Sequence, residues 1–205
     1  MRGAAEVHAD AIRRLSGARY TDELLGLEGD AARAYFAVFH SMIRNSDETF
    51  EFRGRSRRPP LDATNALLSF LYGVLRNDCV SALESVGLDP QIGFLHALRP
   101  GRPALALDLM EELRAPLVDR LVLTLINLRQ VGPGGFKQRP GGAVELDEAT
   151  RKKVIVAYQE RKRVEVSHPV LKKAIPMGLV PHIQARLLAR HLRGDIPEYP
   201  PYLFR

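Results

Sequence analysis

Apolar residues recur at helical spacing over most of the chain. Between Thr21 and Ile43, leucine, alanine and aromatic residues follow the three- and four-residue steps of one helix face. Thr21 and Asp22 are candidate N-caps, and Glu23 falls in the first turn, where an acid is favoured by the helix dipole. Residues 4–15 predict a shorter helix before this one. The pattern therefore predicts two helices at the start of the chain.

The most apolar helix is predicted over residues 65–87. It is apolar nearly all round, which is typical of a central, buried helix. Asp62 or Thr64 would cap its start, and Gly87 would end it. The preceding segment is predicted to be a loop, because its arginines are followed by two prolines that stop any helix. These arginines are Arg53, Arg55, Arg57 and Arg58.

The rest of the chain reads as further helices joined by loops. A helix is predicted to start near Asp89, with Pro90 in its first turn. Another is predicted over residues 104–131, interrupted near Pro116. The later elements are a flexible loop at 132–142, a short extended piece, a basic amphipathic helix capped by Asp147, a last helix at 175–194 and an irregular tail. We find no internal repeat, and the strand signal is slight, so the predicted class is all-α.

Composition is that of a globular protein without a disulfide scaffold. The 205 residues are 45% hydrophobic, which suits one domain, or one with a small appendage. No apolar run reaches the roughly 18 residues that a membrane span needs. The N-terminus has acids and His8 where a signal peptide would be apolar. With the single Cys79, these features predict a cytoplasmic protein.

The charge balance is basic, with a net charge of +6 and a pI of about 9.7. Such a balance is one footprint of nucleic-acid binding, although many basic proteins bind none. Several common sites are absent from the sequence. There is no GxxxxGK[ST] loop, no CxxC and no HExxH pattern, which argues against P-loop nucleotidases and against structural or peptidase zinc sites. Ser69 and Ser81 fall within a helical pattern without a nucleophile elbow.

The stretch GFLHALRPGRPALALDLMEELR, residues 93–114, combines a histidine with several acids. Asp108 and Glu111 lie three residues apart and share one helix face, where two carboxylates repel unless a cation or proton lies between them. Ordinary helix polarity explains these acids equally well, and Glu112 would then be a solvated neighbour. His96 alone is commonly a structural histidine, and Glu28 alone is a first-turn acid. A set of Glu, His and a second acid would suit Mg²⁺ or Mn²⁺.

Several segments in order carry a resemblance to one family. They are LLGLEGDAARAYF, GRSRRPPLDATNALLSFLYGVL, GLDPQIGFLHALRPGRPALALDLMEELRAPLVDRLV and ERKR. Together they resemble the helical domain of the CRISPR adaptation integrase, the metal-dependent DNA endonuclease that inserts new spacers into CRISPR arrays in antiviral defence. The match runs from about residue 22 to 131, and more loosely to about 165.

The resemblance implies a single helical catalytic domain over residues 1–205. Within it, residues 1–20 would end an interdomain linker or helix, 132–142 would be a flexible loop and 195–205 an irregular tail. The family has an N-terminal β-rich domain used in dimerisation. Because the chain is predicted to begin with a helix, we expect that domain to be absent from this chain.

The resemblance also implies a metal site. Glu28 matches the glutamate of the family's EG motif, and His96 matches the histidine of its GFxH motif, both of which are metal ligands. Glu111 closes the triad in a DxxD/E pattern whose first acid is Asp108, and which of these two binds directly stays open. Tyr72 falls where the family has a tyrosine near the active site, with a predicted catalytic role. The implied cofactor is Mg²⁺ or Mn²⁺.

Basic residues are expected to contact DNA phosphates, so that affinity would fall with salt. The predicted set is Arg53, Arg55, Arg57, Arg58, Arg99, Arg102, Lys152, Lys153, Arg161, Lys162 and Arg163. Each of these residues is also consistent with an ordinary solvated surface. Arg57, Arg58 and Asn65 match the family's RRPPxxxxN region.

The implied reaction is attack of a DNA 3′-OH on a phosphodiester of the CRISPR repeat, with the metal as Lewis acid. Because a histidine ligand must be neutral, low pH should weaken metal binding. The implied partners are double-stranded spacer and repeat DNA, a second copy of the full protein, the second small CRISPR adaptation protein and a CRISPR-associated exonuclease, with no membrane. Two alternatives are a non-catalytic DNA-binding or assembly module and a small-molecule metal hydrolase on a helical bundle. The arginine-rich loop and the basic helix count against the hydrolase.

Overall fold

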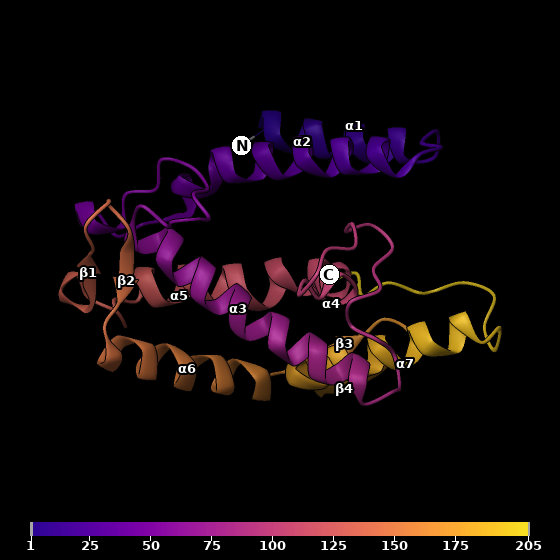
Figure 1. Cartoon of the computed structure of the whole chain (residues 1–205). Coiled ribbons are helices and arrows are strands. Elements are labelled where there is room, and N and C mark those ends of the chain that lie inside the picture. Colours follow the sequence, from indigo (N-terminus) through magenta and orange to yellow (C-terminus); the bar gives the residue numbers. More distant parts are fainter. Residues whose placement is uncertain (1, 205) are drawn as a thin grey trace. The chain divides into compact units, whose positions relative to one another are not determined.

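The computed structural model of the chain describes residues 2–204 (Figure 1). The chain divides into two compact units. The first contains the residues up to Ala66 together with Leu125–Asp147, and the second contains Leu67–Thr124 together with the residues from Glu148 onward. The prediction of one domain over residues 1–205 is not tested by this division and stays a prediction.

The first unit begins with two helices, α1 (Arg2–Leu15) and α2 (Thr21–Phe39), which run side by side (Figure 1). Both were predicted from periodicity and are confirmed. The buried side of α2 contributes Phe36 and Phe39, whose rings pack against Phe52. The predicted N-cap is wrong, because the cap position is Tyr20, which makes no side-chain cap bond, and Thr21 is already helical.

The remainder of the first unit is short elements and one hairpin. The 3₁₀ turns are η1 (His40–Met42), η2 (Glu48–Phe50) and η4 (Pro133–Gly135). Strands β1 (Phe136–Gln138) and β2 (Val144–Leu146) pair antiparallel. Phe136 packs edge-to-face on the buried Phe50, with ring centroids 5.7 Å apart, which fixes the hairpin on the apolar core of this unit. The predicted flexible loop at 132–142 is therefore partly regular structure.

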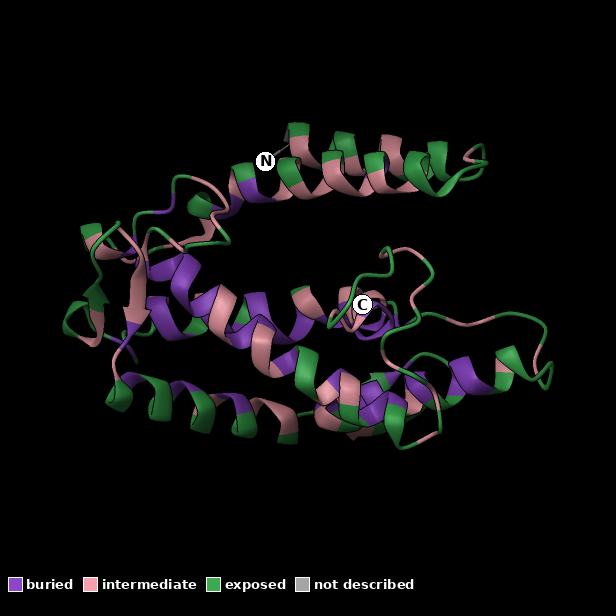
Figure 2. Ribbon diagram, in the orientation of Figure 1, coloured by how far each residue is buried: buried purple, intermediate pink, exposed green. Residues whose placement is uncertain are grey.

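Helix α3 (Ala63–Glu84) is the predicted central helix, and Figure 2 shows its long buried side. Leu67, Leu71 and Leu75 have no exposed surface. Asp62 is the cap, because its Oδ1 accepts the backbone N–H of Asn65 at 2.7 Å. The chain turns away after the helix at Gly87, whose φ of +79° needs glycine, as predicted.

The second unit is built on a long, interrupted helical path. Helix α4 (Ala104–Leu113) leads into a π-helical stretch, η3 (Arg114–Asp119), and then into α5 (Arg120–Asn127), which belongs to the second unit as far as Thr124. Pro116 lies in the π-helical stretch, because a proline removes a backbone donor and the wider turn accommodates it. The predicted interruption is confirmed at this point.

The remaining elements of the second unit lie near the C-terminus. They are α6 (Glu148–Arg163), β3 (Glu165–His168), β4 (Lys173–Pro176), η5 (Met177–Leu179) and α7 (Val180–Leu192). Strands β3 and β4 pair antiparallel, with Val166 opposite Ile175. Helix α7 packs on α4, and α6 packs on η5. No helix among the described residues is both long and apolar enough to cross a membrane.

Two predictions about the fold are wrong. The all-α class fails because the chain, although mainly helical, carries the antiparallel hairpins β1–β2 and β3–β4. Their strands are three or four residues long, and only β2 coincides with the predicted short extended piece; the others are too short for an alternating pattern to be recognised. The helix predicted from Asp89 is also missing, because residues 89–103 form an irregular segment up to α4. The contacts of that segment explain why.

Candidate active site

The segment 89–103, which we call the histidine loop, is docked on the start of α4. The carbonyl oxygen of Pro90 accepts the backbone N–H groups of Leu105 and Ala106 at 2.9 and 3.2 Å. These are N–H groups that a helix start leaves without a helical partner. At Gly93 a Cβ would lie only 2.8 Å from the Ala104 backbone carbon, so the close approach requires glycine. The loop therefore caps the helix that carries the candidate acids.

Asp108, one turn into α4, holds the histidine loop by its carboxylate. Its Oδ2 accepts the N–H groups of Phe94 and Leu95 at 2.6 and 3.1 Å. Its Oδ1 accepts the N–H of His96 at 2.9 Å and lies 2.7 Å from His96 Nδ1. Because a carboxylate can only accept, Nδ1 carries a proton, and the lone pair of the neutral ring is on Nε2. Both side chains are mostly buried, with 16% and 14% of their surface exposed.

Glu111 lies one turn further along α4 and is bound by an arginine. Both of its oxygens accept from Arg114 Nη1, at 2.8 and 2.7 Å. The guanidinium carbon of Arg114 lies 4.7 Å from the centre of the Tyr72 ring. The Tyr72 hydroxyl in turn donates to the buried Asp119. Burial raises the pKa of Tyr72, and the neighbouring Asp119 raises it further. Tyr72 therefore stays protonated and joins α3 to η3, and its predicted catalytic role stays a prediction.

The candidate metal ligands lie in both units. Glu28 is a half-buried residue of α2 in the first unit, whereas His96, Asp108 and Glu111 belong to the second. Within either unit, over residues 2–204, no three histidine, cysteine or acidic side chains converge on one point. The structure brings together His96 and Asp108, with Glu111 three residues further along α4. An imidazole nitrogen with carboxylate oxygens is a donor set that suits Mn²⁺ or Mg²⁺.

Glu112 has a role that the sequence did not indicate. It was expected to be solvated, but its carboxylate accepts Gln184 Nε2 at 2.8 Å, the Tyr202 N–H at 2.6 Å and the Tyr199 hydroxyl. Gln184 also meets the buried His168, whose Nε2 lies 3.2 Å from Gln184 Oε1. The contacts tie the tail to α4 and α7. No local pattern could have shown this, because the partners are more than 70 residues away.

Asn65 organises the loop that precedes α3, residues 53–60, which we call the arginine loop. The buried amide accepts Arg55 Nη1 at 2.7 Å and the Ser56 N–H at 3.0 Å through Oδ1. Its Nδ2 donates to Gly54 O at 2.8 Å and to Asp62 Oδ2 at 2.6 Å. Burial raises the pKa of Asp62, although its bonds to Asn65 oppose the shift. Arg55 is thus an internal support of this loop.

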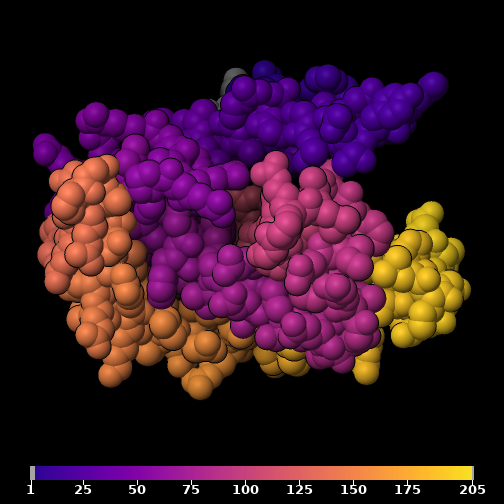
Figure 3. Space-filling view, viewed as in Figure 1, coloured from indigo at the N-terminus to yellow at the C-terminus, as the bar shows by residue number. Residues whose placement is uncertain are grey.

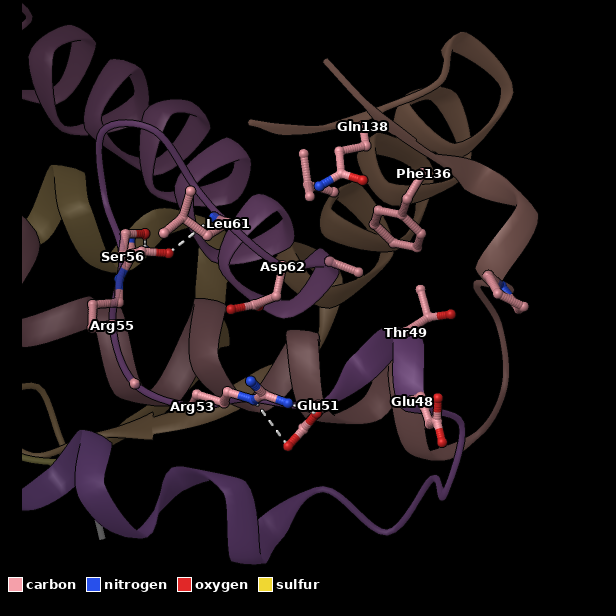
Figure 4. A pocket seen from close by; sticks show the side chains of 14 residues that line it. Glu48, Thr49, Glu51, Arg53, Arg55, Ser56, Leu61, Asp62, Phe136 and Gln138 are labelled. Atoms are coloured by element: carbon pink, nitrogen blue, oxygen red, sulfur yellow. Dashed lines mark hydrogen bonds and ion pairs between the residues drawn. The ribbon is translucent and has the colours of Figure 1, made fainter. Parts of the chain in front are cut away.

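A pocket of about 870 Å³ lies beside the arginine loop (Figure 4). Arg53 is at its rim and donates to both oxygens of Glu51, at 3.1 and 2.9 Å. Glu48 and Asp62 also line the pocket, with Phe136 as the aromatic wall. Because three acids face this space, it is a poor place for a phosphate group.

The predicted DNA-binding set separates into engaged and unengaged cations. Beside Arg53 and Arg55, three members are engaged: Arg161 donates to Pro116 O, Lys162 pairs with Asp78, and Arg163 pairs with Glu160. In the part of the chain that the structure describes, the other members make no side-chain hydrogen bond or ion pair. They are Arg57, Arg58, Arg99, Arg102, Lys152 and Lys153. Cations without an acidic partner are the ones available to phosphates.

Arg99 and Arg102 form the two ends of one tight turn. The Arg102 N–H donates to Arg99 O at 3.0 Å, and Gly101 between them has a φ of +71°. Pro100 followed by a glycine with positive φ is typical of a type II turn. The turn lies in the histidine loop, three residues after His96.

The family model of CRISPR associated protein Cas1 matches residues 1–160 of the chain. This chain belongs to the Cas1 family. The chain is 58% identical over 197 residues to CRISPR-associated endonuclease Cas1 1 of Moorella thermoacetica. That alignment covers 96% of this chain and 57% of the relative, so the chain spans little more than half of that protein's length.

Solved structures agree with the Cas1 family fold. A casposase bound to integration product superposes with a TM-score of 0.86 at 27% identity, covering 95% of this chain and 55% of that one. A Cas6-RT-Cas1–Cas2 complex matches with a TM-score of 0.82 at 26% identity, over 96% of this chain and 21% of the other. The expectation that the family's N-terminal β-rich domain is absent from this chain is corrected by the family match, which begins at residue 1.

Proposed function

We propose that this chain carries the catalytic site of a metal-dependent DNA endonuclease and integrase, which inserts spacer DNA into CRISPR arrays. The reaction would be attack of a DNA 3′-OH on a phosphodiester of the repeat, so that one ester bond forms as another breaks and the leaving oxygen takes a proton. Membership of the Cas1 family supports the proposal. So does the similarity to a relative named an endonuclease and to a casposase bound to integration product.

The observation that carries the proposal is the orientation of His96. Asp108 accepts hydrogen bonds from the backbone N–H and from Nδ1 of His96. The ring is therefore held in one tautomer, with Nε2 available as a ligand atom. A carboxylate behind a histidine is the usual second contact of metal-binding histidines, because it fixes the ring and raises its basicity.

The contacts of the two acids on α4 support different roles for them. A carboxylate has about four lone-pair sites, and the four N–H groups of the histidine loop fill those of Asp108. Glu111 accepts only from Arg114 and keeps lone pairs for a cation. We therefore assign His96 and Glu111 as ligands of Mg²⁺ or Mn²⁺, and Asp108 as the residue that positions His96. The resemblance of the EG motif adds Glu28 to the proposed ligands. Such an ion supplies Lewis-acid polarisation of the phosphoryl oxygen.

The unengaged cations are the proposed contacts for DNA. Arg57 and Arg58 project from the arginine loop that Asn65 holds, and Arg99 and Arg102 project from the turn beside His96. Lys152 and Lys153 lie exposed on α6. The proposed partners are duplex DNA, a second copy of the full protein, the second small adaptation protein and a CRISPR-associated exonuclease. The Cas1–Cas2 complex among the similar structures supports the small partner.

A strand-transfer assay with labelled DNA ends and a CRISPR repeat in Mn²⁺ tests the proposal. His96→Ala is expected to lower product formation by at least about 1,000-fold, because positioning and charge stabilisation are lost together. His40→Ala, an exposed residue after α2, is the matched control and should act as the unchanged protein does. Full activity of the His96→Ala protein would exclude this site. Metal-independent DNA binding without any cleavage by the unchanged chain would instead favour the non-catalytic DNA-binding module.

A further inference from the structure

Helix α7 carries a row of basic residues that the predicted DNA-binding set does not include. His182, Arg186 and Arg190 recur every four residues, and all three are exposed. At 3.6 residues per turn they fall within an arc of about 80° and extend over about 12 Å of the helix. None of their side chains makes a hydrogen bond or ion pair within residues 2–204. We call these residues the α7 row.

The opposite side of α7 is fixed in place. Gln184 has no exposed surface and bonds to Glu112 of α4, to the Tyr199 hydroxyl and to Pro200 O. Val180, Ala185 and Leu188 are buried on the same helix. Figure 2 shows buried and exposed positions alternating along α7. A helix held this firmly presents its exposed basic residues at fixed spacing, and no acidic residue occurs in Val180–Leu192 to neutralise the two arginines.

Two further lysines lie on the hairpin that contacts the opposite side of α7. Lys172 and Lys173 are exposed at the turn of the β3–β4 hairpin, and they too lack hydrogen bonds or ion pairs of their side chains in the described chain. Lys173 pairs directly with His168 across the hairpin, and the His168 ring reaches Gln184 of α7. The hairpin therefore meets α7 on its buried side, and its lysines are not part of the α7 row. In the space-filling view the end of α7 and the residues after it, coloured yellow, stand at the surface (Figure 3).

We infer that the α7 row forms an additional phosphate-binding surface for duplex DNA. The inference rests on the proposed DNA-directed function, and it adds α7 to the elements that contact DNA. A DNA strand carries one charge per about 3.4 Å of axis, so about 12 Å of helix can face three or four phosphates. A protein partner is less favoured, because protein interfaces centre on apolar and aromatic anchors, and the α7 row has none.

Duplex binding by the whole chain, measured in EDTA over a series of salt concentrations, tests the inference. The double variant Arg186→Gln/Arg190→Gln removes two contacts, so the slope of log K against log salt should shrink by about 1.8. At about 0.1 M salt this corresponds to binding weaker by roughly 10- to 60-fold. The control is Arg193→Gln, which lies just beyond the same helix and is already paired with Asp195 at 3.0 Å. It should bind DNA as the unchanged chain does.

The outcomes separate this inference from the proposed function. An unchanged salt slope in the double variant, with an unchanged thermal unfolding curve, overturns the DNA surface on α7. If the double variant loses binding to polyglutamate but keeps its DNA binding, the DNA surface on α7 is also overturned. That result would identify an acidic protein as the occupant. Strand transfer in Mn²⁺ is measured separately. If the chain never joins DNA but binds it through the α7 row, the proposed integrase fails while the surface stands.

Discussion

The arginine loop and the histidine loop are built alike but are held by different chemical groups. Each is irregular, and each is held by one polar side chain near the start of the helix that follows it. In the arginine loop that side chain is the amide of Asn65, which donates two hydrogen bonds and accepts two. In the histidine loop it is the carboxylate of Asp108, which only accepts.

The neutral amide of Asn65 and the charged carboxylate of Asp108 have different consequences for the two loops. A neutral amide satisfies donors and acceptors of its loop without adding charge, so the arginine loop can keep its shape while its other arginines face outward. A carboxylate adds a negative charge that the loop must meet with N–H groups and an imidazole. The geometry of the histidine loop therefore depends on the hydrogen bond between His96 Nδ1 and Asp108. Carboxylates act as acceptors elsewhere in the second unit as well. Hydrogen bonds from tyrosine hydroxyls are accepted by Asp78, Glu112 and Asp119.

The largest effect is expected from Asn65→Ala. The change leaves the Ser56 N–H, the Arg55 guanidinium and Gly54 O without this partner in a buried place, at a cost of about 3 kcal/mol in the free energy of unfolding. Urea unfolding measures it. Asn77→Ala, an exposed change on the same helix, should stay within about 0.5 kcal/mol. A loss below about 1 kcal/mol for Asn65→Ala would mean that the arginine loop has another support.

A smaller effect on stability, with a specific effect on metal binding, is expected from Asp108→Asn. The amide keeps one acceptor oxygen for four N–H groups, which should cost about 2 kcal/mol and leave His96 poorly oriented. Mn²⁺ affinity should fall about 10- to 100-fold, as for other residues behind a metal ligand. Titration of Mn²⁺ measures it, with the exposed Asp89→Asn as control. Complete loss of Mn²⁺ binding in Asp108→Asn, with binding kept in Glu111→Gln, would make Asp108 the direct ligand instead.

The smallest effect at neutral pH is expected from Tyr158→Phe. Its hydroxyl donates to Asp78 Oδ2 at 2.8 Å, but Lys162 bonds the same oxygen, so the loss should be about 1 kcal/mol. Burial raises the pKa of Tyr158, and the charge of Asp78 raises it further. The folded chain therefore keeps the proton that an unfolded chain loses above about pH 10.

The stability that Tyr158 contributes is thus complete below about pH 10 and is lost as pH rises above that value. Stability curves from neutral to alkaline pH should be shallower on the alkaline side for Tyr158→Phe than for the unchanged chain. An identical alkaline decline in both proteins would show that this tyrosine–carboxylate pair does not link the second unit to pH. Asn65→Ala should leave the alkaline decline unaltered, because an amide does not titrate.

Local signals predicted the helices well, and contacts distant in sequence explain the failures. The periodic segments that became α2 and α3 were predicted, as was the end of α3 at Gly87, because side-chain spacing and the φ preference of glycine are properties of a few neighbouring residues. The helix predicted from Asp89 failed because Asp108, more than ten residues on, takes the N–H groups of residues 94–96. The tail looked irregular but is bonded to Glu112.

For the candidate site, the sequence by itself determined which residues to consider. The ordered motifs around Glu28, His96 and the acids of α4 indicated the family, and the arginines and lysines indicated a nucleic-acid partner. Only the tertiary structure decided the roles. It showed that three backbone N–H groups and the His96 ring saturate Asp108, that Asn65 supports the arginine loop, and which cations already have partners. The physical reason is that residue type sets what a group can bond, whereas folding sets which partner it meets.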